Sequence, residues 1–226
     1  MIKFINVSKI YPKDVYALKN ISFWIKGGEF VSIVGQSGAG KTTILKLITA
    51  EERPTKGRII IGGWNIGDLR PNETPLLRRQ IGVIFQDFKL LSKKTVYENI
   101  EFALEVTGTP RKKIPGIISQ VLKIVGLGNK AKSFPDQLSQ GEAQRTAIAR
   151  AIVYKPKILL ADEPTGNLDP VNSREVVELL LKINELGITT VLITHNRELV
   201  NFIKKRVITL DHGMIIGDQK EGRYVI

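Results

Sequence analysis

The stretch from Gly35 to Thr42 constrains the fold more than any other part of this sequence. It fits the pattern G-x-x-x-x-G-K-[ST] of a phosphate-binding loop. Glycines let the backbone wrap closely, so that successive N–H groups converge on a polyphosphate. The apolar runs 30–34 and 44–48 predict the strand before the loop and the helix after it that this interpretation requires. We therefore expect a nucleotide-binding α/β fold.

The positions of this loop have separate expected roles at the phosphates. Lys41 is expected to reach the β- and γ-phosphates, Thr42 to bind Mg²⁺, and Thr43 to contact a phosphate. The positive end of the following helix also favours an anion. The alternative is a glycine-rich turn that holds no ligand, and the flanking strand and helix argue against it. The ATP-binding candidates here are Gly35, Gln36, Ser37, Gly38, Ala39, Gly40, Lys41, Thr42 and Thr43.

Two acidic residues follow a second apolar run. Asp162 and Glu163 come directly after residues 158–161, so a strand there would deliver both carboxylates to the phosphates. We expect Asp162 to organise Mg²⁺ through water and Glu163 to act as the general base on the attacking water. Alone, the pair would be better interpreted as exposed carboxylates at a strand end. The phosphate-binding loop favours the catalytic interpretation.

The rest of the pattern predicts alternating strands and helices. Two capping-box patterns, at Thr95 and Ser139, predict helix starts, and so does Asp169 before Pro170. Such alternation favours a mainly parallel sheet covered by helices, and 226 residues suit one α/β core. Strands are expected at 21–25, 59–61, 190–193, 207–210 and 214–216, and helices at about 95–106, 114–125, 139–153, 169–186 and 197–204.

Composition excludes several classes of protein. The chain has no Cys, which excludes disulfides and thiol catalysis. No apolar run approaches the ~18 residues of a membrane span, and the N-terminus lacks a signal-peptide pattern, so a cytoplasmic protein is the simplest expectation. The net charge of +12 suits a polyanionic partner such as nucleic acid, lipid head groups or nucleotides. A solvated basic surface explains it equally well.

The segment 138–142, Leu-Ser-Gln-Gly-Glu, narrows the nucleotide-binding class. It resembles the signature of the ABC ATPase family, usually written LSGGQ. The resemblance covers the whole chain in the family's order. It implies an α/β P-loop NTPase of ABC type, with a mainly parallel core, an N-terminal antiparallel β subdomain and a helical subdomain. Residues 1–226 would form one nucleotide-binding domain, with residues 88–150 inserted as the helical subdomain in a RecA-like core.

The same resemblance implies roles for residues outside the phosphate-binding loop. Tyr11 would stack on adenine, Gln86 would contact ATP and Mg²⁺, and His195 would act in catalysis beside Glu163. Asp169 matches the D-loop. Each also has an ordinary interpretation, such as packing for Tyr11 and helix capping for Asp169. The signature residues Ser139, Gln140, Gly141 and Glu142 would bind ATP held by the opposite subunit of a head-to-tail, ATP-dependent homodimer.

One residue departs from the family's usual signature. Gln140 stands where the motif has glycine, which leaves the closeness or the kinetics of dimer closure open. Ser139 and Gly141, which match the contacts to the γ-phosphate, are kept. Glu142 replaces the final Gln and still completes the capping-box pattern.

Within the family, residues 78–91 and 94–100 resemble the FtsE group of cell-division ATPases. That resemblance implies an integral membrane partner of the FtsX type and a peripheral location at the cytoplasmic face of the bacterial plasma membrane. It also implies signalling to cell-wall hydrolases rather than solute transport. The expected docking segment follows Gln86, where apolar side chains are dense for a loop; a packed local core is the alternative. These side chains are Phe85, Phe88, Leu90 and Leu91.

Two other functions stay open. Residues 160–169 are shared with the ATPases of lipoprotein release and macrolide efflux, so an exporter subunit of that branch is the first alternative. A soluble, nucleic-acid-associated ABC ATPase is the second, suggested by the charge. Lys41 and Ser139 are only 98 positions apart (139 − 41), without sustained heptads, so the long coiled coil of chromosome-maintenance relatives is missing. No specific nucleic acid is expected. A GTPase is disfavoured because the sequence lacks an Asn-Lys-x-Asp motif.

Overall fold

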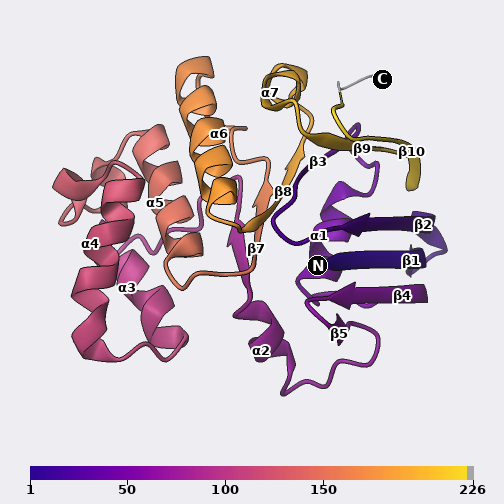
Figure 1. The fold of residues 1–226 in the computed structure, drawn as a ribbon, viewed down its shortest axis with the longest axis horizontal. Coiled ribbons are helices and arrows are strands. Elements are labelled where there is room, and N and C mark those ends of the chain that lie inside the picture. Colours follow the sequence, from indigo (N-terminus) through magenta and orange to yellow (C-terminus); the bar gives the residue numbers. More distant parts are fainter. Residues whose placement is uncertain (223–226) are drawn as a thin grey trace.

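Two β-sheets make up the strand framework of the computed structural model, which describes residues 1–222 (Figure 1). The first is antiparallel, in the order β2-β1-β4-β5, with β1 Ile2–Tyr11, β2 Val15–Ile25, β4 Lys56–Ile61 and β5 Trp64–Asn65. The second has the order β10-β9-β3-β8-β7-β6, with β3 Phe30–Val34, β6 Ile81–Ile84, β7 Ile158–Asp162, β8 Thr189–Thr194, β9 Arg206–Asp211 and β10 Met214–Gln219. All its pairs are parallel except β10 with β9. The expected mainly parallel sheet and N-terminal antiparallel part are both confirmed.

The helices cover the parallel sheet and extend it at one end. Figure 1 shows α3, α4 and α5 gathered at the end of the molecule opposite the antiparallel sheet. The helices are α1 Lys41–Ile48, α2 Thr74–Arg78, α3 Val96–Val106, α4 Ile114–Ile124, α5 Gln140–Ile152, α6 Pro170–Glu185 and α7 Arg197–Ile203. Short 3-10 turns occur at Arg111–Lys113, Gly128–Lys130 and Pro135–Gln137. Among the described residues, no helix is both long enough and apolar enough to cross a membrane.

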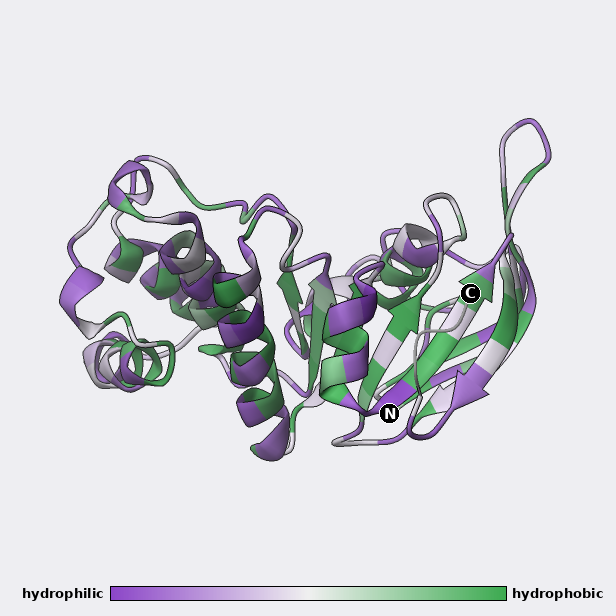
Figure 2. Ribbon diagram, turned by 90° about the horizontal axis from the view of Figure 1, so that it is seen from above, coloured by the Kyte–Doolittle hydropathy of each residue, from purple (hydrophilic) through white to green (hydrophobic). Residues whose placement is uncertain are grey.

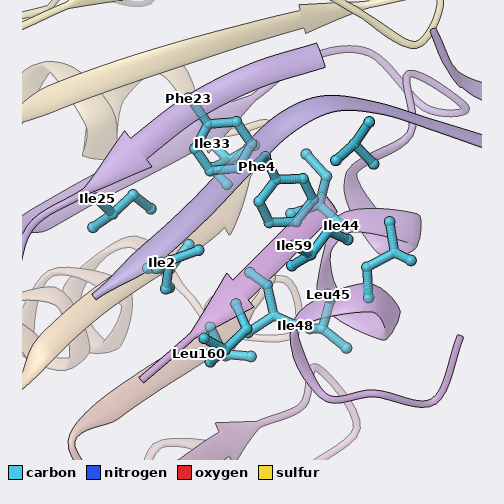
Figure 3. Close-up of a cluster of buried hydrophobic side chains, with 14 of the residues drawn as sticks. Ile2, Phe4, Phe23, Ile25, Ile33, Ile44, Leu45, Ile48, Ile59 and Leu160 are labelled. Atoms are coloured by element: carbon cyan, nitrogen blue, oxygen red, sulfur yellow. The ribbon is translucent and has the colours of Figure 1, made fainter. Parts of the chain in front are cut away.

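Helix α1 lies between the two sheets and carries much of the core. Its side chains Ile44, Leu45 and Ile48 point toward strand residues such as Phe4 and Ile59 (Figure 3). The alternation of β1 places Ile2 and Phe4 on its buried face, and the ring of Phe4 stacks on Phe23 at 4.5 Å. Burial on both sides fixes α1, and therefore the loop that precedes it.

A second apolar cluster joins the helical end to the other side of the parallel sheet. It contains buried residues of α3, α4, α5 and α6 together with residues of β6 and β7. Figure 2 shows the central strands mainly hydrophobic and the outer helix faces mainly hydrophilic, as expected for strands covered on both faces. The helical end is thus packed directly against the sheet edge that carries β6 and β7.

The predicted helix starts are confirmed. Thr95 and Ser139 each accept a hydrogen bond from the backbone N–H three residues later, and the Glu at that position accepts one in return. Asp169 caps α6 by accepting from two backbone N–H groups. β1, β5, α2 and β6 were not predicted from the sequence. β6 is short and contains Gly82, where a Cβ would collide with the Ala151 carbonyl oxygen at the end of α5.

Asn99 anchors the loop that follows β6. It is fully buried in α3, and its Oδ1 accepts from the Leu91 N–H at 2.8 Å. Its Nδ2 faces the carbonyl oxygens of Leu91, Lys94 and Thr95 at 2.9–3.2 Å. The Asn99 side chain therefore pairs the Leu91 N–H and the Lys94 carbonyl oxygen, and adds a second contact to the carbonyl oxygens of Leu91 and Thr95, which also accept backbone N–H groups.

Asn99→Ala is expected to lower the free energy of unfolding by about 2–4 kcal/mol, because it leaves buried N–H and C=O groups unpaired. Urea denaturation measures this. Asn129→Ala is the matched control: Asn129 is exposed in a 3-10 turn, and its change should stay within about 0.5 kcal/mol. Equal stabilities for the two variants would show that Asn99 does not hold the loop.

Candidate functional site

A cavity of about 890 Å³ opens at the carboxyl edge of the parallel sheet. Because β3, β6, β7 and β8 run parallel, their carboxyl ends meet at this edge, where ligands of open α/β sheets bind. The cavity gathers residues that are far apart in the sequence. Its walls are formed by Val15, Tyr16, Ala17, Gln36, Ser37, Gly38, Gly40, Lys41, Thr42, Thr43, Gln86, Asp162, Glu163, His195 and Arg197.

The loop between β3 and α1 is shaped for a close approach of the backbone. Gly40, the N-cap of α1, has φ 105°, and a Cβ there would lie 2.6 Å from the Ala17 carbonyl oxygen. In the part of the chain that the structure describes, no side chain caps this helix start, so its first N–H groups have no competing side-chain acceptor. The Lys41 Nζ folds back and donates to the carbonyl oxygens of Gly35 and Gln36 at 2.7 and 2.9 Å. The loop therefore holds a buried cation beside open backbone donors.

Asp162 and Glu163 lie beside this loop, as the sequence predicts. Burial raises the pKa of Asp162, the neighbouring charge of Glu163 raises it further, and Lys41 lowers it. The two adjacent carboxylates carry more negative charge than Lys41 neutralises, so a divalent cation beside them would stabilise them. Thr42 and Asp162 supply oxygen donors of the kind Mg²⁺ prefers, and Gln86 lies on the same cavity wall. The residues present therefore fit a magnesium ion.

The raised pKa of Asp162 predicts a pH-dependent effect of Asp162→Asn on the nucleotide-free protein. The folded state binds this proton more tightly than the unfolded chain, so ionisation lowers stability as pH rises above the unfolded value near ~3.9. The variant lacks this cost, and we expect its Tm to exceed that of the parent at pH 7. The difference should shrink toward pH ~4. A gain that grows on acidification in thermal unfolding would contradict the assignment.

Glu163 has an uncommon backbone conformation, and two side chains contact its carboxylate. Its φ is 45°, uncommon for a residue with a Cβ, and its N–H donates to the Ile193 carbonyl oxygen at 2.9 Å. The His195 Nδ1 lies 2.6 Å from Oε1, and the Thr194 hydroxyl donates to Oε2 at 3.0 Å. His195 therefore contacts Glu163, and its role in catalysis stays a prediction. Thr194 was not predicted; a hydroxyl residue at the strand end before His195 was the available signal.

Tyr11 does not line the cavity. It ends β1, opposite Val15 in the hairpin, and its ring lies 5.0 Å from the Lys9 Nζ. The aromatic side chain at the cavity wall is Tyr16, which is about half exposed and was not predicted. Stacking of Tyr11 on adenine stays a prediction. Gly35 and Ala39 belong to the loop but not to the cavity wall.

The signature residues lie away from this cavity, at the start of α5. The Ser139 hydroxyl accepts from the Glu142 N–H, and the Glu142 carboxylate pairs with Lys130 at 3.1 Å. A Cβ at Gly141 would collide with the Asn172 side chain, whose amide also bonds Asp169. Gln140 is exposed at the first position of the helix. The signature and the D-loop are therefore neighbours within one chain, and their contact with ATP of another subunit stays a prediction.

The Gln86 segment connects the cavity with the helical end. The Gln86 carbonyl oxygen accepts from the Asn167 side chain at 3.1 Å, and Gln86 packs against Gly166. Farther along, the Arg150 guanidinium donates to the carbonyl oxygens of Phe88 and Lys89 at 2.9 and 2.6 Å. α5 therefore holds the loop in place on its far side.

A mainly apolar groove of about 520 Å³ lies next to this segment. Phe85 and Leu91 line it, together with the exposed α3 residues Phe102 and Val106. Phe88 and Leu90 are half-buried and lie outside its lining. The four predicted docking residues thus divide between an open groove and local packing.

Comparison with known proteins identifies close relatives. A profile described as ABC transporter matches residues 18–166. The chain is 52% identical over 224 residues to the cell division ATP-binding protein FtsE of Bacillus subtilis, covering 99% of this chain and 98% of the relative. The FtsE of Escherichia coli K12 is 46% identical over 217 residues, covering 96% and 98%.

Two solved structures share the fold at substantial sequence identity. A dimeric ATP-binding cassette in a post-hydrolysis state, bound to ADP and Pi, superimposes with a TM-score of 0.86 at 38% identity, covering 99% of this chain and all of that one. The protein cbiO1 of Clostridium perfringens, part of an ABC transporter complex, superimposes with a TM-score of 0.91 at 32% identity. That alignment covers 97% of this chain and 88% of that one.

Proposed function

The chain belongs to the ABC transporter family of ATP-hydrolysing enzymes, and from that premise we propose that it is an ATPase subunit of the FtsE type. It would dimerise on ATP and drive an integral membrane partner of the FtsX type that regulates cell-wall hydrolysis in cell division. The observation that carries the proposal is the single cavity that gathers the phosphate-binding loop, Asp162, Glu163 and His195.

In the proposed reaction, the residues of this cavity have three roles: they bind the phosphates, hold Mg²⁺ and activate the attacking water. The loop N–H groups and Lys41 bind the β- and γ-phosphates. The Lys41 ammonium has three N–H donors, two of which contact loop carbonyl oxygens, so a third is left for a phosphate oxygen. Thr42, Gln86 and Asp162 would hold Mg²⁺, and the ion would supply charge neutralisation at the phosphates. Glu163 accepts the proton of the attacking water, beside His195.

We propose that the second half of each active site comes from another copy of the chain. Ser139, Gln140, Gly141 and Glu142 open α5 at a capped helix start away from their own cavity. A helix N-terminus is an anion site, so it suits the γ-phosphate of an ATP bound by the opposite subunit. The dimeric state of the relative bound to ADP and Pi supports this arrangement.

The membrane partner is proposed to dock at the apolar groove beside Gln86. Exposed apolar surface of this kind marks interaction sites, and Phe102 and Val106 are 44% and 56% exposed there. The groove borders the loop that carries Gln86 into the ATP cavity, so a partner seated in it would sense nucleotide binding. We place the chain at the cytoplasmic face of the plasma membrane through this partner.

Residues 88–150 are proposed as a helical subdomain within a single domain spanning 1–226.

Phe102→Glu tests the docking site. Placing a charge in the apolar groove is expected to abolish co-purification with the FtsX-type membrane protein, while ATP hydrolysis by the isolated chain stays within about twofold. Ile216→Glu is the matched control, because Ile216 is 56% exposed on β10 and lies outside the groove. If both variants, or neither, lost the partner, the groove would not be the docking site. Co-purification with an exporter permease instead would favour the alternative of lipoprotein release or efflux.

A further inference from the structure

We propose that Thr194 is a positioning residue for the hydrolysis step, and that its buried hydroxyl fixes the rotation of the Glu163 carboxylate. The inference rests on the proposed role of Glu163 as the general base. Thr194 ends β8 and is 1% exposed, while Glu163 follows β7, the neighbouring strand in the sheet. The site residues expected from the sequence do not include Thr194, and no role was assigned to its hydroxyl.

The direction of the hydroxyl proton follows from its two partners. A threonine hydroxyl has one hydrogen to donate, and its oxygen accepts. The Thr194 oxygen accepts from the Asn196 N–H at 3.1 Å. The Thr194 hydroxyl donates its one hydrogen bond to Glu163 Oε2, which lies 3.0 Å away. The backbone turn after β8 therefore aims this proton at Glu163.

Within residues 1–222, the Glu163 carboxylate has two side-chain contacts, and the one with Thr194 is the better fixed. The Glu163 backbone is held by the N–H contact to Ile193, but the carboxylate can still rotate. The other side-chain contact is to His195, whose side chain is 69% exposed at the cavity wall. An exposed side chain has several rotamers available, whereas the buried Thr194 is stiff at χ1. With Oε2 held by Thr194, Oε1 remains for His195 and for a water in the cavity.

The merely structural alternative is that Thr194 only stabilises the turn at Asn196. Thr194→Val removes the hydroxyl at nearly constant shape, and Thr194→Ser keeps it. Thr190→Val is the control on the same strand: Thr190 is also fully buried, and its hydroxyl donates to the Ile188 carbonyl oxygen at 3.2 Å instead of contacting Glu163. Any general effect of removing a buried β8 hydroxyl appears in both Val variants.

The experiment measures kcat and KM for ATP hydrolysis by the full chain. We expect Thr194→Val to lower kcat about 10- to 100-fold at unchanged KM, since a misplaced base loses rate rather than substrate affinity. Thr194→Ser should restore kcat to within about threefold, and Thr190→Val should leave it unchanged. A Thr194→Val variant with normal kcat, or a Thr190→Val variant with an equal loss, overturns the proposal. Thr194→Ala carries the same test if the Val variant does not fold.

A double-mutant cycle separates failure of this inference from failure of the proposed function. In a Glu163→Gln background, Thr194→Val should lower the residual rate no further, because both substitutions act on one group. A full additional loss in that background shows that Thr194 acts elsewhere. If Glu163→Gln alone hydrolyses ATP normally, the base assignment fails instead.

Discussion

Glu163→Gln is expected to retain ATP binding and to lower the rate of ATP hydrolysis by about 10²–10⁴-fold, the range that general-base catalysis contributes. The amide keeps the shape of the side chain but cannot accept the proton of the attacking water. Its contacts with Thr194 and His195 keep it in place, so the loss should appear in kcat and not in nucleotide affinity. Phosphate release under saturating ATP measures the first quantity, and equilibrium binding of ATP measures the second.

Glu175→Gln is the matched control for this prediction. Glu175 of α6 pairs with Arg145 of α5 at 3.1 Å and does not line the cavity. It removes the same charge from the chain, and hydrolysis should stay within about twofold of the parent rate. A Glu163→Gln variant with a rate equal to that of this control would remove Glu163 from the reaction.

Lys41→Ala is expected to abolish tight ATP binding. The variant loses the cation at the polyphosphate, and removal of one partner from a close charge pair costs about 2–5 kcal/mol, or about 30- to 5000-fold in affinity. Lys41 also donates to two loop carbonyl oxygens, so the loop itself should loosen in the variant. Equilibrium titration with ATP and Mg²⁺ measures the loss.

Lys46→Ala provides the comparison for Lys41→Ala. Lys46 lies in the last turn of the same helix and outside the cavity, so it changes the net charge equally without touching the phosphates. Its ATP affinity should match that of the parent. Unchanged affinity in Lys41→Ala would contradict the assignment of the phosphate-binding loop.

The fold class and the helix starts were predictable because local chemistry specifies them. The capping boxes at Thr95 and Ser139 and the cap at Asp169 need only residues within three positions. The phosphate-binding loop is similarly local. The apolar runs of β3, β7 and β8 are buried on both faces, so each appears in the sequence as a continuous signal.

Other elements depend on contacts that no local pattern carries. The pairing register of β1 with β2 shifts between Phe4 and Val7, and Asn6 between them has a positive φ. The alternation of buried and exposed side chains is broken there. Gly82 interrupts the apolar pattern of β6, and a side chain there would collide with the end of α5. These strands are specified by tertiary packing rather than by a sequence period.

The site shows the same division. Lys41, Asp162 and Glu163 follow from motifs, and the structure brings them to one cavity with His195. Thr194 did not stand out, since its partner Glu163 is 31 positions away in the sequence. Tyr11 illustrates the converse: its resemblance-based role concerns a bound nucleotide, and the position of its ring beside Lys9 does not test it.

In the proposed function, one chain holds only half of each active site, so that ATP joins two copies. Sedimentation velocity of Glu163→Gln with and without ATP and Mg²⁺ tests it most directly, because this variant should bind ATP without consuming it. We predict a species of 25.2 kDa without nucleotide and a dimer of twice that mass, 2 × 25.2 = 50.4 kDa, with it. A monomer that persists at saturating, demonstrably bound ATP would contradict the claim.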